Sequence, residues 1–208
     1  MGASKVLLPP PYSLGASTSE YDLARGKLGR VVLDTNLLAP LLEPPGISAW
    51  LAKMLDGCLE KAVIRQSLTE YFSSPVAMRA ADYDEVTKKL RKMGIKVLPG
   101  PLTTDRAGRI ASEILQARYD SILAKKLRSK TLQDPLEATR KEWRKVITSS
   151  KVDVDLASEA FCKGFAFLTA DNNFACSFAP ELDERKMATH VVPNSWLKPP
   201  TMPIGSTS

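Results

Sequence analysis

Short apolar segments alternate with longer amphipathic segments along most of the chain. The short ones are rich in β-branched and aromatic residues, as at 30–34 and 165–169. The longer ones carry apolar residues at intervals of three and four, as at 47–60, which is the period of a helix with one buried face. Strands separated by helices in this way pair in parallel and are covered on both faces. The sequence therefore predicts an α/β fold, a three-layer α/β/α sandwich with a central, mainly parallel sheet.

The same patterns place the individual elements. Strands are expected at 30–34, 62–64, 95–98, 165–169 and 189–192. Helices are expected at 47–60, after residue 67, and at 81–93, 104–130, 135–147 and 153–163. Ser67 is expected to cap its helix, with Glu70 at the capping-box position.

The two ends of the chain differ from the middle. Residues 1–29 are rich in Pro, Ser and Gly without a regular period, so a flexible N-terminal extension is expected there, and 199–208 is expected to form a similar tail. One folded domain then spans 30–198. No apolar run approaches the roughly 18 residues of a membrane span, and no secretory signal is found. Cys58, Cys162 and Cys176 are expected to be reduced thiols. These features predict a cytoplasmic protein without a membrane segment.

The positive charge is unevenly distributed. The chain has 29 Lys and Arg, 23 Asp and Glu, a net charge of +6 and a pI near 9.2. Ten of the basic residues but only four of the acidic ones lie in 118–151. This segment is interpreted as a helical insertion, at about 118–150, with a basic face. A solvated helix surface is the alternative interpretation. The candidate nucleic-acid contacts are Lys125, Lys126, Arg128, Arg140, Lys141, Arg144 and Lys145.

Four acidic residues stand at junctions between the predicted elements. Asp34 and Asp171 follow strands, and the carboxyl ends of parallel strands form the ligand crevice of such sheets. Glu70 and Asp153 lie in the first turns of helices. Each of them could simply cap a helix or belong to a turn.

If these four side chains converge, they can coexist as anions only around a cation. Oxygen ligands without His or Cys favour Mg²⁺ or Mn²⁺, which activate water for attack on phosphate esters. A metal-free ribonuclease with paired histidines is excluded, because the chain has one His. A basic protein with such a site is interpreted as a phosphodiesterase that acts on nucleic acid.

Three stretches carry a family resemblance. They are 31–38, with Asp34-Thr35-Asn36 after a hydrophobic run; 66–71, with Glu70; and 153–174, with Thr169-Ala170-Asp171 after a hydrophobic strand. In order and separation they resemble PIN-domain ribonucleases, the family of the VapC toxins. The resemblance implies a PIN-like nuclease domain over 30–198. It implies that the catalytic residues and the ligands of Mg²⁺ or Mn²⁺ are Asp34, Glu70, Asp153 and Asp171. It also implies supporting polar roles for Asn36 and Thr169, and it places Asn173 where relatives often have another acid.

The implied activity is metal-dependent hydrolysis of RNA phosphodiester bonds by an endoribonuclease. One form of it is the toxin of a toxin–antitoxin pair, with a protein inhibitor and a homodimer as expected partners. The alternatives are an RNA-processing or DNA-acting nuclease, and a catalytically silent module that binds RNA or protein. The N-terminal extension and the long 118–151 segment depart from compact members of the family. Asp155 could replace a missing acid, but two residues after Asp153 on a helix it points away.

Overall fold

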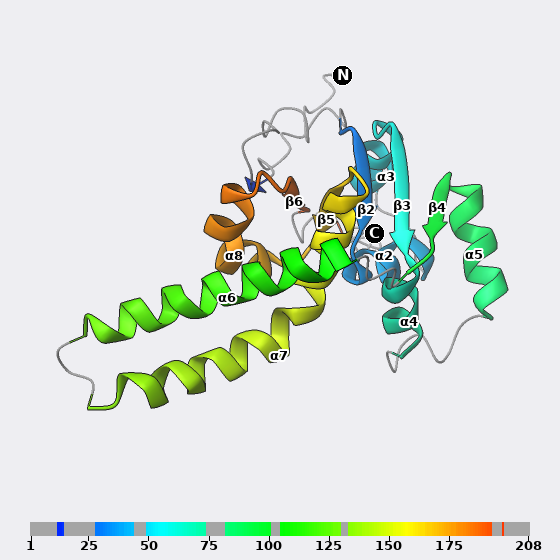
Figure 1. Cartoon of the computed structure of the whole chain (residues 1–208). Helices are drawn as coiled ribbons and strands as arrows, with labels where there is room; N and C mark the ends of the chain where they lie inside the picture. The colour runs from blue at the N-terminus through cyan, green and yellow to red at the C-terminus, as the bar shows by residue number, and fades with distance from the viewer. Residues whose placement is uncertain are drawn as a thin grey trace, which may run out of the picture.

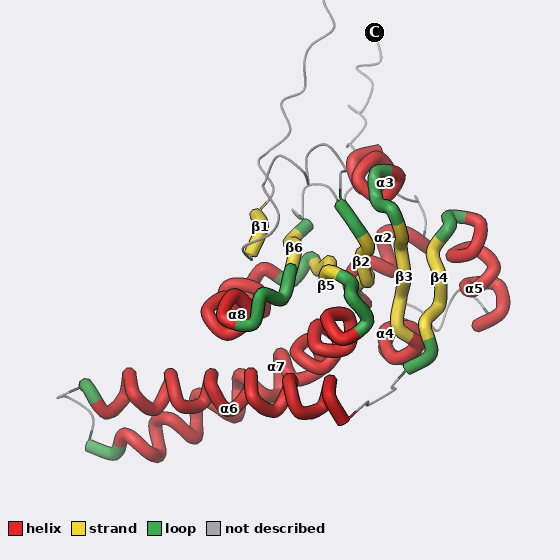
Figure 2. Tube along the Cα trace, turned by 45° about the horizontal axis from the view of Figure 1, so that its top comes forward, coloured by secondary structure: helices red, strands yellow, loops and turns green. Residues whose placement is uncertain are grey.

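A single six-stranded sheet forms the centre of the protein. The computed structural model describes residues 12–14, 28–43, 49–73, 82–100, 105–129, 133–192 and 197. The strand order is β1-β6-β5-β2-β3-β4, and all neighbours pair in parallel except β1, which is antiparallel to β6 (Figure 2). The strands are β1 (Tyr12–Leu14), β2 (Arg30–Leu33), β3 (Glu60–Ile64), β4 (Ile95–Leu98), β5 (Ala166–Thr169) and β6 (Thr189–Val191).

Helices cover both faces of this sheet (Figure 1). They are η1 (Thr35–Leu37), α2 (Leu38–Leu42), α3 (Ala49–Asp56), α4 (Arg65–Ser73), α5 (Tyr83–Lys92), α6 (Asp105–Leu127), α7 (Pro135–Cys162) and α8 (Asn172–Glu184). Successive side chains of a strand point to opposite faces, so Val31 and Leu33 pack with the leucines of α2 to α5, while Val32 packs against α6, α7 and α8. The predicted three-layer α/β/α sandwich with a mainly parallel sheet is confirmed.

The order of the strands creates a topological switch point, called the crevice below because ligands of such sheets bind there. From β2 the chain proceeds outward through β3 to β4, then returns past β2 to form β5 and β6 on its other side. Strands β2 and β5 are therefore neighbours from which the chain leaves in opposite directions. Ligands of open α/β sheets bind at such a point, outside the carboxyl ends of the strands. Asp34 follows β2 there, and Asp171 follows β5.

Helices α6 and α7 form a long antiparallel hairpin that extends away from the sheet (Figure 1). The sequence predicted two helices, 135–147 and 153–163, where the structure has the single helix α7. The separation was wrong because the polar residues between them do not break the helix. Thr148 and Ser149 donate their hydroxyls to the carbonyls of Arg144 and Lys145, one turn earlier, which is a way for such residues to be accommodated inside a helix.

Two other details differ from the sequence interpretation. Tyr12–Leu14, within the segment expected to be a flexible extension, form the edge strand β1. Ser67 is not a helix cap, because α4 begins at Arg65, directly after β3. Its side chain is buried instead, and Glu70 is not part of a capping box with it.

The three cysteines are free thiols, as predicted. In the part of the chain that the structure describes, no helix combines the length and the apolar character needed to cross a membrane.

The continuity of α7 can be tested with proline. Ser149→Pro removes a helix hydrogen bond and introduces a clash, so we expect the free energy of unfolding to fall by about 3 kcal/mol or more. Ser149→Ala, at the same exposed position, should change it by no more than about 0.5 kcal/mol, in the stabilising direction. Urea denaturation compares the two variants. Equal stability of both would mean that α7 is interrupted here.

Candidate active site: a carboxylate cluster

Asp34 lies at the bottom of the crevice and is 2% exposed. Its backbone N–H donates to the carbonyl of Leu168 at 2.8 Å, which extends the pairing of β2 with β5. Its Oδ1 accepts the N–H of Thr35 at 2.6 Å. Its Oδ2 accepts Nδ2 of Asn36 at 2.7 Å and Oγ1 of Thr169 at 2.6 Å. The carboxylate is therefore held in one orientation by neighbours from both strands.

Thr169 and Asn36 form the support that the family resemblance implied. The Thr169 hydroxyl donates to Asp34 and accepts from Asn36 Nδ2 at 3.0 Å and from the N–H of Asp171 at 2.9 Å. It thus uses its one donor and both lone pairs. Asn36 Oδ1 in turn accepts the N–H of Ala170 at 2.9 Å. These bonds fix the chain that leaves β2 relative to the chain that leaves β5.

Glu70 reaches the same crevice from α4. Its Oε2 accepts the hydroxyl of Thr35 at 2.7 Å, and its Oε1 lies 3.5 Å from Nε2 of Gln66. Sequence reasoning gave no role to Thr35 or Gln66. Thr35 could have been noticed, because it stands between two residues with assigned roles. Gln66 carries no such signal, since its contact depends on α4 starting immediately after β3.

Asp153 brings a further carboxylate from the middle of α7. Its pKa is raised to about 8, first by burial and then by the negative charges of Asp34, Asp171 and Glu70. Asp34 has a pKa raised to about 6, again mainly by burial, with Glu70 and Asp171 contributing. The structure therefore brings together all four acidic residues that the sequence singled out. Within the described ranges, neither a hydrogen bond nor an ion pair reaches the Asp153 side chain, so no protein cation offsets this repulsion.

Asp171 has a second, structural role. Its Oδ1 caps α8 by accepting the N–H groups of Asn173 and Phe174, at 2.8 and 3.0 Å. The cap and the cluster are compatible, because Oδ2 takes no hydrogen bond from the described residues. Asn173 contributes its backbone N–H to this cap, while the residue itself is exposed.

The donor set suits a hard divalent cation. Four carboxylates with neither His nor Cys among them match the oxygen ligands that Mg²⁺ and Mn²⁺ favour. A cation would also offset the repulsion that raises the pKa of Asp153 and Asp34. As the side chains stand, however, no group of three or more His, Cys, Asp or Glu in the described part of the chain is arranged to hold a metal ion. The donor types therefore fit a hard divalent cation.

The candidate nucleic-acid contacts all lie on the α6–α7 hairpin or just beyond the end of α6. They are exposed, except that Lys126 is half-buried and forms an ion pair with Glu142 at 2.6 Å. Lys141 and Lys145 follow one another by one turn of α7 and border a shallow hollow with Lys126. The hairpin therefore presents a basic surface, named here the basic arm: Lys125, Lys126, Arg128, Arg140, Lys141, Arg144 and Lys145.

Replacement of Asp153 should stabilise the metal-free protein at high pH. The folded-state pKa of about 8 lies above the ordinary value of 3.8, so between these values the folded protein holds a proton that the unfolded chain releases. The free energy of unfolding then falls as the pH rises through this window. We expect Asp153→Asn in EDTA to gain more than about 1 kcal/mol at pH 9 and much less at pH 5.

Urea denaturation at the two pH values measures this difference. Asp155→Asn, two residues along the same helix, is the matched control and should gain no stability at pH 9, because it removes the ion pair with Lys151. A gain for the control, or none for Asp153→Asn, would contradict the repulsion described above.

No protein-family model matches the chain, and no curated protein matches it. The relation to PIN-domain ribonucleases therefore rests on the motif residues of the sequence and stays a prediction. What the structure adds is that these residues, far apart along the chain, lie in one crevice.

Proposed function

We propose that this protein is a metal-dependent endoribonuclease that hydrolyses RNA phosphodiester bonds at the carboxylate cluster. One observation carries the proposal: Asp34, Glu70, Asp153 and Asp171 converge at a place where burial first, and then their mutual repulsion, raise the pKa of Asp34 and of Asp153. Acidic residues kept together at such a cost are typical of functional sites. A protein gains nothing in stability from gathering like charges without a cation.

Each side chain has a defined task in the proposed reaction. Asp34, fixed by Thr35, Asn36 and Thr169, is the rigid ligand, while Asp153 and Asp171 bring carboxylates from α7 and α8. Glu70, oriented by the Thr35 hydroxyl, positions the attacking water. A bound Mg²⁺ or Mn²⁺ would supply an activated water and would stabilise the charge that develops on the phosphate. Hydrolysis in this manner leaves a 5′-phosphate and a 3′-hydroxyl.

The basic arm supports a polyanionic substrate. The segment 118–151 has ten basic and four acidic residues of the chain's 29 and 23, which leaves nineteen of each in the rest. The entire net charge of +6 is thus carried by the segment 118–151. Lys and Arg side chains that bind backbone phosphates give affinity without reading sequence. An acidic cluster for hydrolysis and a basic arm for binding the RNA strand are together consistent with a nuclease.

The activity can be tested with purified protein on single-stranded RNA, structured RNA and matched DNA. We expect RNA cleavage in Mn²⁺ or Mg²⁺, none in EDTA, and a loss of at least 100-fold in Asp34→Asn, because the fixed ligand is lost. Asp56→Asn is the matched control. Asp56 lies at the end of α3, just before β3 begins, and so near the amino-terminal ends of the strands, whereas the cluster lies at their carboxyl ends. Cleavage that survives EDTA or Asp34→Asn would contradict the proposal, as would faster cleavage of DNA than of RNA.

The role of the basic arm can be tested by salt dependence. We expect the triple variant Lys141→Gln, Arg144→Gln, Lys145→Gln to bind single-stranded RNA more weakly. The slope of log K against log salt should also become shallower by up to about 2, at about 0.7 per lost phosphate contact. Filter binding in EDTA measures both quantities. The control neutralises three exposed residues of α5, Lys88, Arg91 and Lys92. Equal losses in the two variants would mean that the arm has no special role.

A further inference from the structure

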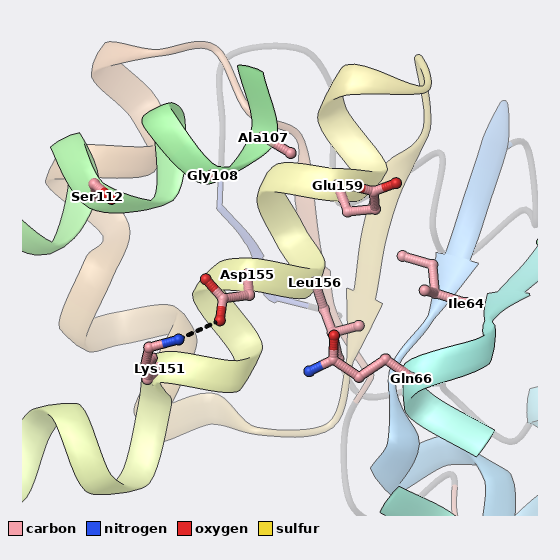
Figure 3. A pocket seen from close by; sticks show the side chains of 9 residues that line it. All are labelled: Ile64, Gln66, Ala107, Gly108, Ser112, Lys151, Asp155, Leu156 and Glu159. Carbon is pink, nitrogen blue, oxygen red and sulfur yellow. Dashed lines mark hydrogen bonds and ion pairs between the residues drawn. The ribbon is translucent and has the colours of Figure 1, made fainter. Parts of the chain in front are cut away.

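A cavity of about 260 Å³ lies beside the carboxylate cluster. It is enclosed by the end of β3, the start of α4, the first turns of α6 and the later turns of α7 (Figure 3). Ile64 and Leu156 contribute apolar walls, and both are almost completely buried. At the opposite side, Gly108 of α6 leaves the helix backbone uncovered. The cavity, called the slot below, is thus bordered by apolar side chains on one side and by helix backbone on the other.

The rim of the slot is polar. Asp155 accepts Lys151 Nζ at 2.7 Å through Oδ2, and no described residue donates to its Oδ1. Gln66 and Ser112 add an amide and a hydroxyl. Glu159, 7% exposed, lies deeper, with its Oε1 3.1 Å from Lys163 Nζ. The groups at the rim can bind both hydrogen-bond donors and acceptors of a ligand.

The slot and the cluster are connected through Gln66. This residue lines the slot and also lies 3.5 Å from Glu70. Helix α7 contributes to both, because Asp153 and Asp155 are about 200° apart around its axis. Asp153 faces the other acids, while Asp155 faces the slot. The slot and the cluster therefore lie on different sides of α7, and Gln66 is the residue that they share.

Gly108 is a second observation that favours an open, accessible slot. A glycine inside a helix costs roughly 0.5–1 kcal/mol relative to alanine. A Cβ built on Gly108 meets nothing within 4 Å, so packing inside the protein does not require glycine. The missing side chain does, however, leave the wall of the slot flat and accessible. Close approach of a ligand to the backbone is one of the established uses of glycine.

The size and charge of the slot select the ligand class. The volume is slightly below the roughly 300–1,000 Å³ of pockets for drug-sized molecules, which suits a single flat ring system. Phosphate is disfavoured, because Lys151 is already paired with Asp155 and the adjacent cluster is acidic. A neutral heterocycle with N–H donors fits better, since the Asp155 carboxylate only accepts. Proteins read single-stranded RNA through unstacked bases of this kind.

We propose that the slot binds one unstacked RNA base, a base that carries an exocyclic amino group, from a nucleotide near the bond that the cluster cleaves. This assignment rests on the proposed nuclease function and adds to it the origin of sequence preference. Asp155 accepts the amino group, Gln66 and Ser112 meet the remaining edge, and the ring lies against the backbone at Gly108. Uracil has a carbonyl in place of the amino group, so it can reach Asp155 only through its N3–H and is expected to bind more weakly.

Binding can be measured without any cleavage. The full-length protein in EDTA is titrated with nucleosides and followed by NMR chemical shifts, in two pairs that differ by an amino group against a carbonyl: adenosine with inosine, and cytidine with uridine. We expect the amino-bearing member of at least one pair to bind tenfold more tightly than its partner. The largest shifts should fall on the slot residues. Equal binding of all four nucleosides, or shifts elsewhere, would overturn the assignment.

Variants then test the slot itself. Gly108→Leu fills it and should weaken nucleoside binding at least tenfold while raising the melting temperature, because leucine favours a helix. Asp155→Ala should remove the discrimination within each pair. Ser121→Leu, at an exposed position of the same helix outside the slot, is the control. Unchanged binding in both slot variants would contradict the assignment.

Mapping of cleavage sites separates this assignment from the proposed function. If the wild type cleaves RNA with a base preference that Gly108→Leu abolishes, both stand. If the variant cuts at the same positions as the wild type, the slot assignment fails and the nuclease stands. If the nucleosides bind selectively but no RNA is cut under any metal condition, the nuclease proposal fails and the slot remains a nucleoside site.

Discussion

The hydrogen bonds that the Asp34 side chain and backbone make with the β5 segment are the contact on which the crevice depends. One Thr169 hydroxyl serves three partners, and the Asp34 N–H continues the β2–β5 ladder beyond the strand ends. A buried carboxylate without such donors would be too costly to keep in the protein interior. Because the two strands are fixed at this point, the chain segments that leave them, and the acids that these segments carry, have defined positions.

The cluster opposes folding, and the two hydrophobic cores compensate. Burial and mutual repulsion raise the pKa of Asp34 and Asp153, so in the absence of a cation their ionised forms destabilise the native state. The apolar residues of β2 pack on both faces of the sheet, with Val32 on one side and Val31 and Leu33 on the other. The destabilising charges thus lie at the carboxyl ends of the strands and on the adjoining helices, with Asp153 inside α7.

The sequence predicted the layers and the four acids, because both depend on local patterns. Strand periodicity identified β2, β3, β4, β5 and β6, and position after a strand identified Asp34 and Asp171. It did not predict β1, whose pairing with β6 has no local signature, nor the continuity of α7, where Thr148 and Ser149 bond within the helix. The roles of Gln66 and Gly108 also escaped. The contact of Gln66 with Glu70 depends on α4 starting directly after β3, and the place of Gly108 depends on how α6 packs against elements distant in the sequence. Tertiary contacts decide such features.

Because α7 is one continuous helix, it connects two distant surfaces, the basic arm and the crevice, at a fixed distance. Lys141 stands near its outer end and Asp153 beside the crevice, so the helical rise of about 1.5 Å per residue sets roughly 18 Å between them along the axis. A loop of the same length would let that span vary. In the helix, a single inserted residue would turn the basic face by about 100° relative to the crevice. Substitutions in this stretch should therefore be far less disruptive than insertions or deletions. The number of helical residues sets the distance from the basic arm to the crevice.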